Sequence, residues 1–218
     1  MRESIRILIT ALALFATGSA FALNPGDGDG DTGASNAPVI FVHGYAGNNR
    51  QWSDMERNFR SNGYSSSELY TFGYSSTTRS NSNSAGSLRS FVNNVRSNHS
   101  QDPHIVAHSN GGLVARYYLV NLGGSSNTGR FVSLGSPHSG TTTAYACFSP
   151  ACFDMRPGSS FLNQLAGRGC DRSIWSSVDA VINPTSSARC GTSIRGPSIG
   201  HIALMSDSRV GSLIRDQF

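Results

Sequence analysis

Residues 105–112 read Ile-Val-Ala-His-Ser-Asn-Gly-Gly, an apolar run that ends abruptly in a serine surrounded by small residues. A serine that leaves the end of a strand and enters a helix needs a strained, crowded backbone, which only small neighbours allow. Ala107 and Gly111 stand at the two flanking positions, so the pattern is G-x-S-x-G with alanine in the first place. We interpret Ser109 as a candidate nucleophile.

The segments on either side of Ser109 fit this interpretation. Residues 104–108 are typical of a short buried strand, and residues 112–122 carry apolar side chains at helical spacing. Strand, turn and helix therefore follow one another in the required order. The alternative is a serine that only caps a helix after a core strand.

Apolar runs and amphipathic segments alternate along the chain, which predicts a parallel sheet with helices on both faces. Right-handed crossovers leave few other topologies for such a pattern, and the length suits a single compact α/β domain over residues 38–218. The predicted strands are 38–42, 69–74, 104–108, 131–134 and 173–178, and the predicted helices are 51–61, 88–95 and 112–122.

The beginning of the chain resembles an export signal rather than part of the fold. Residues 1–22 have two arginines, a short apolar core and an Ala-Phe-Ala ending, which predicts a cleaved secretory signal peptide. Residues 23–37 are rich in Gly, Asp and Ser, which predicts a flexible linker. We expect a secreted protein, extracellular or periplasmic, with no transmembrane segment in the mature chain.

The charge pattern argues against a nucleic-acid partner. The formal charge is +4, every basic residue apart from histidine is arginine, and the arginines are scattered rather than clustered. Asp27, Asp29 and Asp31 lack the glycine and distal glutamate of a calcium loop. No metal-ligand spacing appears elsewhere. We expect a monomer that needs no metal and no cofactor.

A glycine-rich loop follows the first predicted strand, at residues 43–47 (His-Gly-Tyr-Ala-Gly). Such a loop can leave backbone N–H groups pointing at a ligand, as one half of an oxyanion hole requires. The residue after the nucleophile supplies the other half. These donors are predicted to be the amides of Tyr45 and Asn110, and the alternative is an ordinary strand-to-helix turn.

Chain order selects the base that would activate Ser109. In this fold the order is serine, acid, histidine, and only His138 and His201 follow the serine. No Asp or Glu lies between Ser109 and His138, so His201 is the candidate base. The remaining histidines beside predicted strands are expected to be structural: His43, His104 and His108.

The acid must come from Asp154, Asp171 or Asp179, which lie between Ser109 and His201. Asp179 follows the predicted strand 173–178, and catalytic groups of such sheets gather beyond the carboxyl ends of strands. Asp154 and Asp171 lie in a segment rich in Cys, Gly and Arg, where a salt bridge or a helix cap is the expected role. Asp179 is therefore the candidate acid.

Six short motifs occur in order along the chain: HGYAG (43–47), AHSNGG (107–112), LGSPHSGT (134–141), MRPGSSFL (155–162), SSVDAVI (176–182) and GHIAL (200–204). Together they resemble the small secreted bacterial triacylglycerol lipases of the α/β-hydrolase superfamily, including the class 2 lipases and the minimal lipases of Bacillus. The resemblance covers roughly residues 38–216. It implies the same roles as the arguments above: Ser109 as nucleophile, Asp179 as acid, His201 as base, and the amides of Tyr45 and Asn110 as the oxyanion hole.

The segment 142–172 departs from the smallest family members because it is longer and carries three of the four cysteines. We expect it to shape or cover the substrate cleft. Four cysteines permit three disulfide pairings, and an exported protein would form them. The favoured pairs are Cys147–Cys152 and Cys170–Cys190.

The sequence thus predicts an exported serine ester hydrolase, a lipase or carboxylesterase, that acts on acyl esters or lipids, including at a lipid–water interface. Two alternatives remain open. One is a polyester depolymerase of cutinase or polyhydroxyalkanoate type, and the other is a catalytically inactive hydrolase fold that only binds apolar surfaces.

Overall fold

The computed structural model describes residues 36–218, which form one unit built on a single sheet. The predicted signal peptide and most of the predicted linker lie outside the described residues. Asn36, which falls within that predicted linker, donates from its side chain to the carbonyl of Gly63 over 3.0 Å. Within residues 36–218 no helix is long and apolar enough to cross a membrane.

Six parallel strands form the sheet, in the order β2-β1-β3-β4-β5-β6. The strands are β1 Val39–Val42, β2 Leu69–Phe72, β3 His104–His108, β4 Phe131–Leu134, β5 Arg172–Trp175 and β6 Thr192–Arg195. The α-helices are α1 Ser53–Arg60, α2 Asn81–Arg96, α3 Asn110–Asn121, α4 Pro150–Met155, α5 Ser160–Leu165 and α6 Ser208–Arg215. Short 3₁₀ helices are η1 Asn49–Trp52, η2 Ser66–Glu68, η3 Gly124–Ser126, η4 Thr142–Ala146, η5 Thr185–Ala188 and η6 Ile202–Met205. This confirms the predicted α/β-hydrolase architecture.

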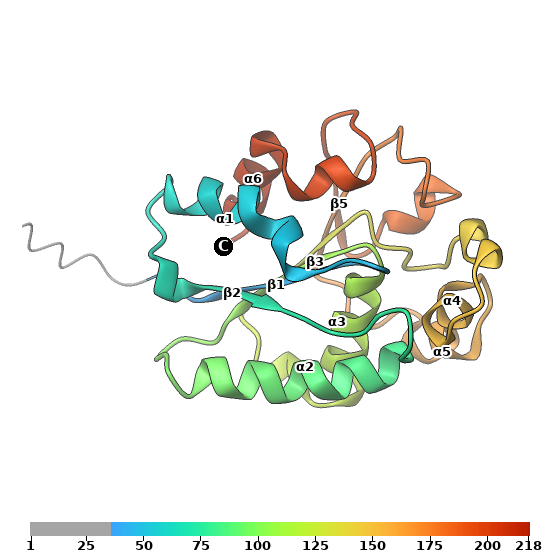
Figure 1. Ribbon diagram of the computed structural model, residues 1–218, viewed down its shortest axis with the longest axis horizontal. Helices are drawn as coiled ribbons and strands as arrows, with labels where there is room; N and C mark the ends of the chain where they lie inside the picture. The colour runs from blue at the N-terminus through green and yellow to red at the C-terminus, as the bar shows by residue number, and fades with distance from the viewer. Residues whose placement is uncertain (1–35) are drawn as a thin grey trace, which may run out of the picture. The chain divides into compact units, whose positions relative to one another are not determined.

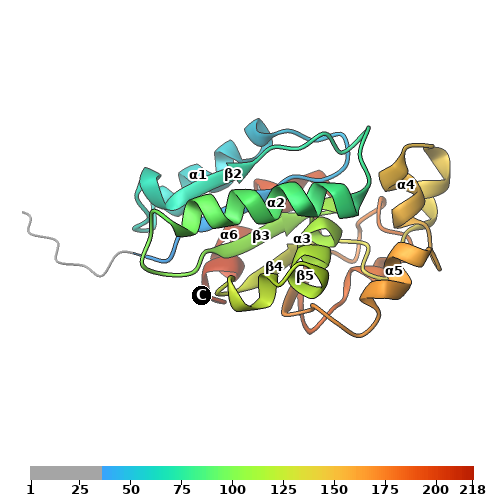
Figure 2. The same ribbon diagram turned by 90° about the horizontal axis from the view of Figure 1, so that it is seen from below.

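Helices cover both faces of the sheet, with α1 and α6 on one side and α2 and α3 on the other (Figures 1 and 2). Successive strand residues point to opposite faces, so Phe41 packs with Trp52 and Phe59 while Ile40 and Val42 pack under α2 and α3. All of these side chains are buried. Each contributes about 1.5–3 kcal/mol by burial, which explains why β1 has no polar face.

Some boundaries differ from the sequence prediction. The last predicted strand was expected over 173–178, but β5 ends at Trp175, so Asp179 lies four residues beyond it in a loop. Helix α2 begins at Asn81 instead of residue 88, because the side chain of Ser80 caps its polar first turn by accepting from the Asn83 amide. The prediction missed β6 because most of its residues are exposed and form no apolar run.

Helices α4 and α5 lie beyond the carboxyl ends of the strands, beside α3 (Figure 1). They pack on Leu113 through a small apolar cluster that includes Phe161 and Leu165. Two disulfides, Cys147–Cys152 and Cys170–Cys190, confirm the predicted pairing. The second one joins the chain before β5 to the chain after it, and it encloses the loop that carries Asp179.

Gly111 allows α3 to approach β1 closely, and this contact fixes where the helix begins. A Cβ at Gly111 would lie 2.5 Å from the His43 carbonyl oxygen and 2.8 Å from that of Val42, and backbone atoms cannot move aside cheaply. We predict that Gly111→Ala lowers the free energy of unfolding by about 1–3 kcal/mol. Thermal unfolding followed by circular dichroism should show a Tm lower by about 2–4 °C for each kcal/mol.

Gly86 provides the matched control, since it lies inside α2 and a Cβ there would meet nothing within 4 Å. Gly86→Ala should raise the stability by up to about 1 kcal/mol, because alanine is the better helix former. Equal Tm values for the two variants would contradict the close approach at Gly111.

Candidate active site

Ser109 occupies the turn between β3 and α3 in a strained backbone conformation. Its φ of 54° and ψ of −127° lie where residues other than glycine are rarely found, at a cost of about 1–3 kcal/mol. Its amide is fixed by a 2.9 Å bond to the Leu134 carbonyl at the end of β4. Within residues 36–218 the Ser109 side chain makes no capping hydrogen bond to α3, which argues against the helix-cap alternative.

The structure brings Asp179 and His201 into direct contact. His201 Nδ1 lies 2.7 Å from Asp179 Oδ2, and both side chains are almost fully buried. The other oxygen of Asp179 accepts from the amides of Val181 and Ile182 over 2.9 and 3.0 Å. Because a carboxylate only accepts, Nδ1 carries the proton of this hydrogen bond and Nε2 is left as the basic nitrogen.

Electrostatics keep Asp179 ionised in this setting. Burial by itself raises the pKa of its carboxyl. The hydrogen bond and charge of His201, together with the two loop amides, outweigh burial and lower the pKa below its ordinary value. At neutral pH the buried carboxylate is therefore charged and orients the His201 ring.

His108 connects the His201 loop to the serine. Its ring centroid lies 4.4 Å from that of His201, and its Nε2 donates to the His201 carbonyl over 3.0 Å. Burial lowers the pKa of His108 to about 3, with a smaller contribution from His201, so the ring stays neutral. His201 thus packs against the residue that directly precedes Ser109.

His201 packs on the residue before Ser109, but the serine and the histidine are not themselves hydrogen-bonded among the described residues. Among the hydrogen bonds of residues 36–218, none joins the Ser109 hydroxyl to His201. In free enzymes such bonds are often long and tighten only when substrate binds. Gly135, with a φ of 52°, follows β4 and leaves room for the bonded Asp179 and His201 side chains, because a Cβ there would lie 3.0 Å from Asp179 Oδ2 and 3.3 Å from His201 Nδ1.

The loop after β1 places Tyr45 beside the serine turn. A Cβ on Gly44 would lie 2.8 Å from Ser109 Cβ, so loop and turn are in contact. The two amides that follow the predicted donor Tyr45 already have acceptors. The amide of Ala46 donates to Ser76 Oγ over 2.8 Å, and the amide of Gly47 donates to the Gly44 carbonyl. Asn110, at the first position of α3, has an amide that helix geometry leaves without an intrahelical acceptor.

The other two acids have partners elsewhere. Asp154 accepts from the amide of Asn81 over 2.8 Å at the start of α2, as a helix cap would. Asp171 pairs with Arg172 at 2.8 Å and with Arg130 at 3.7 Å. Neither contacts a histidine that follows Ser109.

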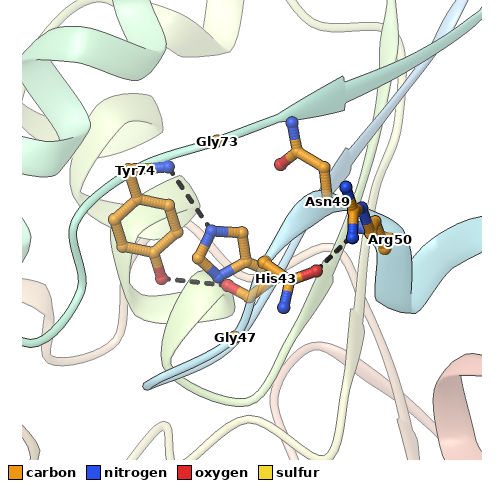
Figure 3. A pocket seen from close by; sticks show the side chains of 7 residues that line it. His43, Gly47, Asn49, Arg50, Gly73 and Tyr74 are labelled. Carbon is orange, nitrogen blue, oxygen red and sulfur yellow. Dashed lines mark hydrogen bonds between the residues drawn. The ribbon is translucent and has the colours of Figure 1, made fainter.

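The other buried histidines also have local partners. His138 lies in the core, where its Nε2 is 2.8 Å from the hydroxyl of Ser133 and its Nδ1 is 3.4 Å from Arg116. Burial, and secondarily the charge of Arg116, lower the pKa of His138 well below its ordinary value. His43 lines a pocket of about 440 Å³ behind the glycine-rich loop, stacked on Tyr74 (Figure 3).

Sequence reasoning missed Tyr74 and Asn81. Tyr74 was expected only as the end of a strand, and Asn81 lies in a polar Ser/Asn stretch that gave no helical signal. Both side chains contact Asn110. Only the high content of N-capping residues before α2 could have indicated that this stretch is ordered.

The fold and the site geometry define an α/β-hydrolase. The family described as lipase (class 2) matches residues 36–197, which is more than half of the chain. The chain belongs to the class 2 lipase family, and is accordingly a lipolytic hydrolase.

Solved structures of lipolytic enzymes share the fold at low sequence identity. The mature form of the Bacillus licheniformis lipase BlEst2 is similar with a TM-score of 0.71 and 16% identity, covering 84% of this chain and 91% of that one. Aspergillus fumigatus lipase B gives 0.67 and 14%, covering 78% and 49%. A structure described with the metagenome-derived lipolytic enzymes LipS and LipT gives 0.63 and 12%, covering 84% and 92%.

The buried histidines make the stability depend on pH. Burial, then the charge of Arg130, lower the pKa of His104 from 6.5 to about 4, against the opposing charge of Asp171. Between these values the unfolded chain binds a proton that the folded chain excludes. We therefore predict that the free energy of unfolding falls as the pH is lowered from 6.5 towards 4, and that this contribution is fully present above pH 6.5.

Urea unfolding at several pH values between 7 and 4 measures this dependence. His104→Gln, at the start of β3, should show a shallower fall than the natural protein while keeping the same fold. A fall of equal steepness in both would contradict the contribution of His104.

Proposed function

We propose that the protein is an exported serine ester hydrolase that cleaves acyl esters such as triacylglycerols. Ser109 is the nucleophile, His201 the base and Asp179 the acid, while the amides of Tyr45 and Asn110 receive the oxyanion. The observation that carries the proposal is the buried 2.7 Å bond between Asp179 and His201, packed against the residue before a strained serine.

The mechanism follows from the protonation states. Because Nδ1 of His201 is held by the carboxylate, Nε2 takes the proton of the Ser109 hydroxyl as its oxygen attacks the ester carbonyl. The two amides stabilise the resulting oxyanion. His201 then returns the proton to the leaving alcohol, and an acyl-enzyme forms. Water activated by the same histidine releases the acid.

The exposed apolar side chains support an apolar substrate. Val178 is next to Asp179 and Ile202 is next to His201, and the Thr141 and Thr143 hydroxyls tie η4 to the same loop through the Val181 carbonyl. Large exposed apolar groups of this kind favour contact with lipid at an interface. Among residues 36–218 the exposed large hydrophobic side chains are Tyr145, Phe148, Phe153, Val178, Val181 and Ile202.

The segment 142–172 carries the aromatic members of this set. The guanidinium of Arg156 lies 4.3 Å from the ring centre of Phe153 and 5.0 Å from that of Tyr145, and it donates to the Cys147 carbonyl. These contacts, with the Cys147–Cys152 disulfide, hold the rings in place. They support the proposal that this segment shapes the substrate cleft. The two disulfides also favour export.

Ser109→Ala tests the proposed nucleophile directly. Hydrolysis of p-nitrophenyl esters, measured from short to long acyl chains, should fall about 10⁶-fold, since removing a serine nucleophile disables the whole triad. A fluorophosphonate probe should label the natural protein and not the variant. Ser97→Ala, at the exposed far end of α2, is the matched control and should behave like the natural protein. Retained turnover in Ser109→Ala would contradict the assignment.

Asp179→Asn tests the acid. The amide cannot hold the correct tautomer of His201 or stabilise the imidazolium, so kcat should fall on the order of 10⁴-fold. Asp171→Asn should cost less than about tenfold, because Asp171 pairs with partly exposed arginines and with the Phe131 amide and contacts neither His201 nor Ser109. Steady-state kinetics on one soluble ester compare the two. A larger loss for Asp171→Asn would assign the acid to the segment before β5.

A further inference from the structure

Tyr74 makes three contacts with His43, the first residue of the glycine-rich loop. Its ring stacks on His43 at 4.4 Å between centroids with 15° between the planes. Its amide donates to His43 Nε2 over 3.4 Å, and its hydroxyl donates to the His43 carbonyl over 2.9 Å (Figure 3). Tyr74 follows β2, so these contacts fix the His43 peptide from the neighbouring strand.

The same hydroxyl also contacts the other side of the site. The side-chain amide of Asn110 donates to the Tyr74 oxygen over 3.4 Å and to Asn81 Oδ1 over 2.8 Å. The Asn110 side chain is fully buried, so these polar contacts have no water to replace them. One phenol oxygen thus joins the segment that carries Tyr45 to the first residue of α3.

The loop needs such a restraint. Gly44 has no side chain to restrict its backbone, and Ala46 adopts a left-handed φ of 54°, a conformation that persists only where the surroundings hold it. The bond from Ala46 to Ser76 holds one side of Tyr45. The bond from Tyr74 to the His43 carbonyl holds the other side.

We propose that Tyr74 is a positioning residue, which sets the spacing of the two oxyanion-hole amides by bonding the His43 carbonyl and the Asn110 side chain at once. The inference rests on the proposed function, since it assumes that the amides of Tyr45 and Asn110 stabilise the oxyanion. An oxyanion hole depends on donors held within a few tenths of an ångström. Removing the Tyr74 hydrogen bonds should therefore weaken the stabilisation of the transition state more than the binding of the substrate.

The hydroxyl keeps its donor role across the working pH range. Burial raises the pKa of Tyr74 well above its ordinary value, despite a smaller opposing effect of the bond from Asn110. The phenol is therefore protonated wherever an ester hydrolase with a histidine base is active. Asn81 restrains Asn110 from a second direction, and its own amide is anchored on Asp154 in α4.

Tyr74→Phe removes the hydroxyl and keeps the stacked ring. On a soluble p-nitrophenyl ester, kcat should fall by about tenfold while KM changes by less than about twofold, since a displaced donor costs less than a deleted one. The inhibition constant of a boronic acid, whose serine adduct places an oxygen in the hole, should rise by the same factor as kcat falls. The Tm should stay within a few degrees of that of the natural protein.

Two further variants separate positioning from general support. Tyr70→Phe is the control and lies within β2, just before Tyr74. Among residues 36–218 the hydroxyl that it removes is hydrogen-bonded to His99 at 2.8 Å, so kcat and boronic acid binding should stay unchanged. Asn110→Ala keeps the backbone donor but breaks the other half of the link. It also removes the bond to Asn81. The double variant with Tyr74→Phe should lose less than the product of the two single losses, because both variants remove the contact between Tyr74 and Asn110.

The Ser109→Ala result keeps the two proposals apart. Natural kcat and boronic acid affinity in Tyr74→Phe, beside an inactive Ser109→Ala, overturn only the role of Tyr74. A fall in kcat that comes with a large fall in Tm and with unchanged boronic acid affinity also overturns it, because that result shows that Tyr74 only supports the structure. Full activity in Ser109→Ala overturns both proposals.

Discussion

The strained backbone at Ser109 is the constraint on which the rest of the site depends. A left-handed serine persists only where its surroundings over-determine it. Here β1 and β3 supply that rigidity, because both are buried on the two faces of the sheet and pair in register along their length. Gly44 and Gly111 then allow the loop after β1 and the start of α3 to meet the serine turn. A side chain at either position would separate the elements that hold it.

The same dense packing distinguishes His201, the proposed base, from the other buried histidines. Burial disfavours the charged form of every imidazole it surrounds, and it lowers the pKa of His43, His108 and His138. Their nearest partners are carbonyls, hydroxyls or an arginine, none of which stabilises an imidazolium as a carboxylate does. His201 bonds directly to an ionised carboxylate. The charge of Asp179 also raises the pKa of His108, but there burial outweighs it and the pKa stays low.

The fold was predictable wherever burial imposed a pattern. Each strand buried on both faces, such as β1 or β4, appeared in the sequence as an apolar run, whereas the exposed edge strand β6 carried no pattern. Chain order led from Ser109 to His201, and the predicted strand 173–178 then singled out Asp179 among the three aspartates that chain order allowed. Tyr74 and Asn81 could not be found this way. Their importance lies in contacts with Asn110 across 36 and 29 residues, which only the folded chain brings together.

The members of the site also differ in how they are supported. Ser109 and Asn110 sit at the junction of a strand and a helix, while Asp179 belongs to a loop that left β5 four residues earlier. Two amides of that loop donate to Asp179, and the hydroxyls of Thr141 and Thr143 donate to its Val181 carbonyl. The loop also lies inside the ring closed by Cys170–Cys190. A disulfide adds most restraint where the chain has no helix or strand to hold it. The disulfide and the two threonine contacts therefore restrain Asp179, as the sheet restrains Ser109.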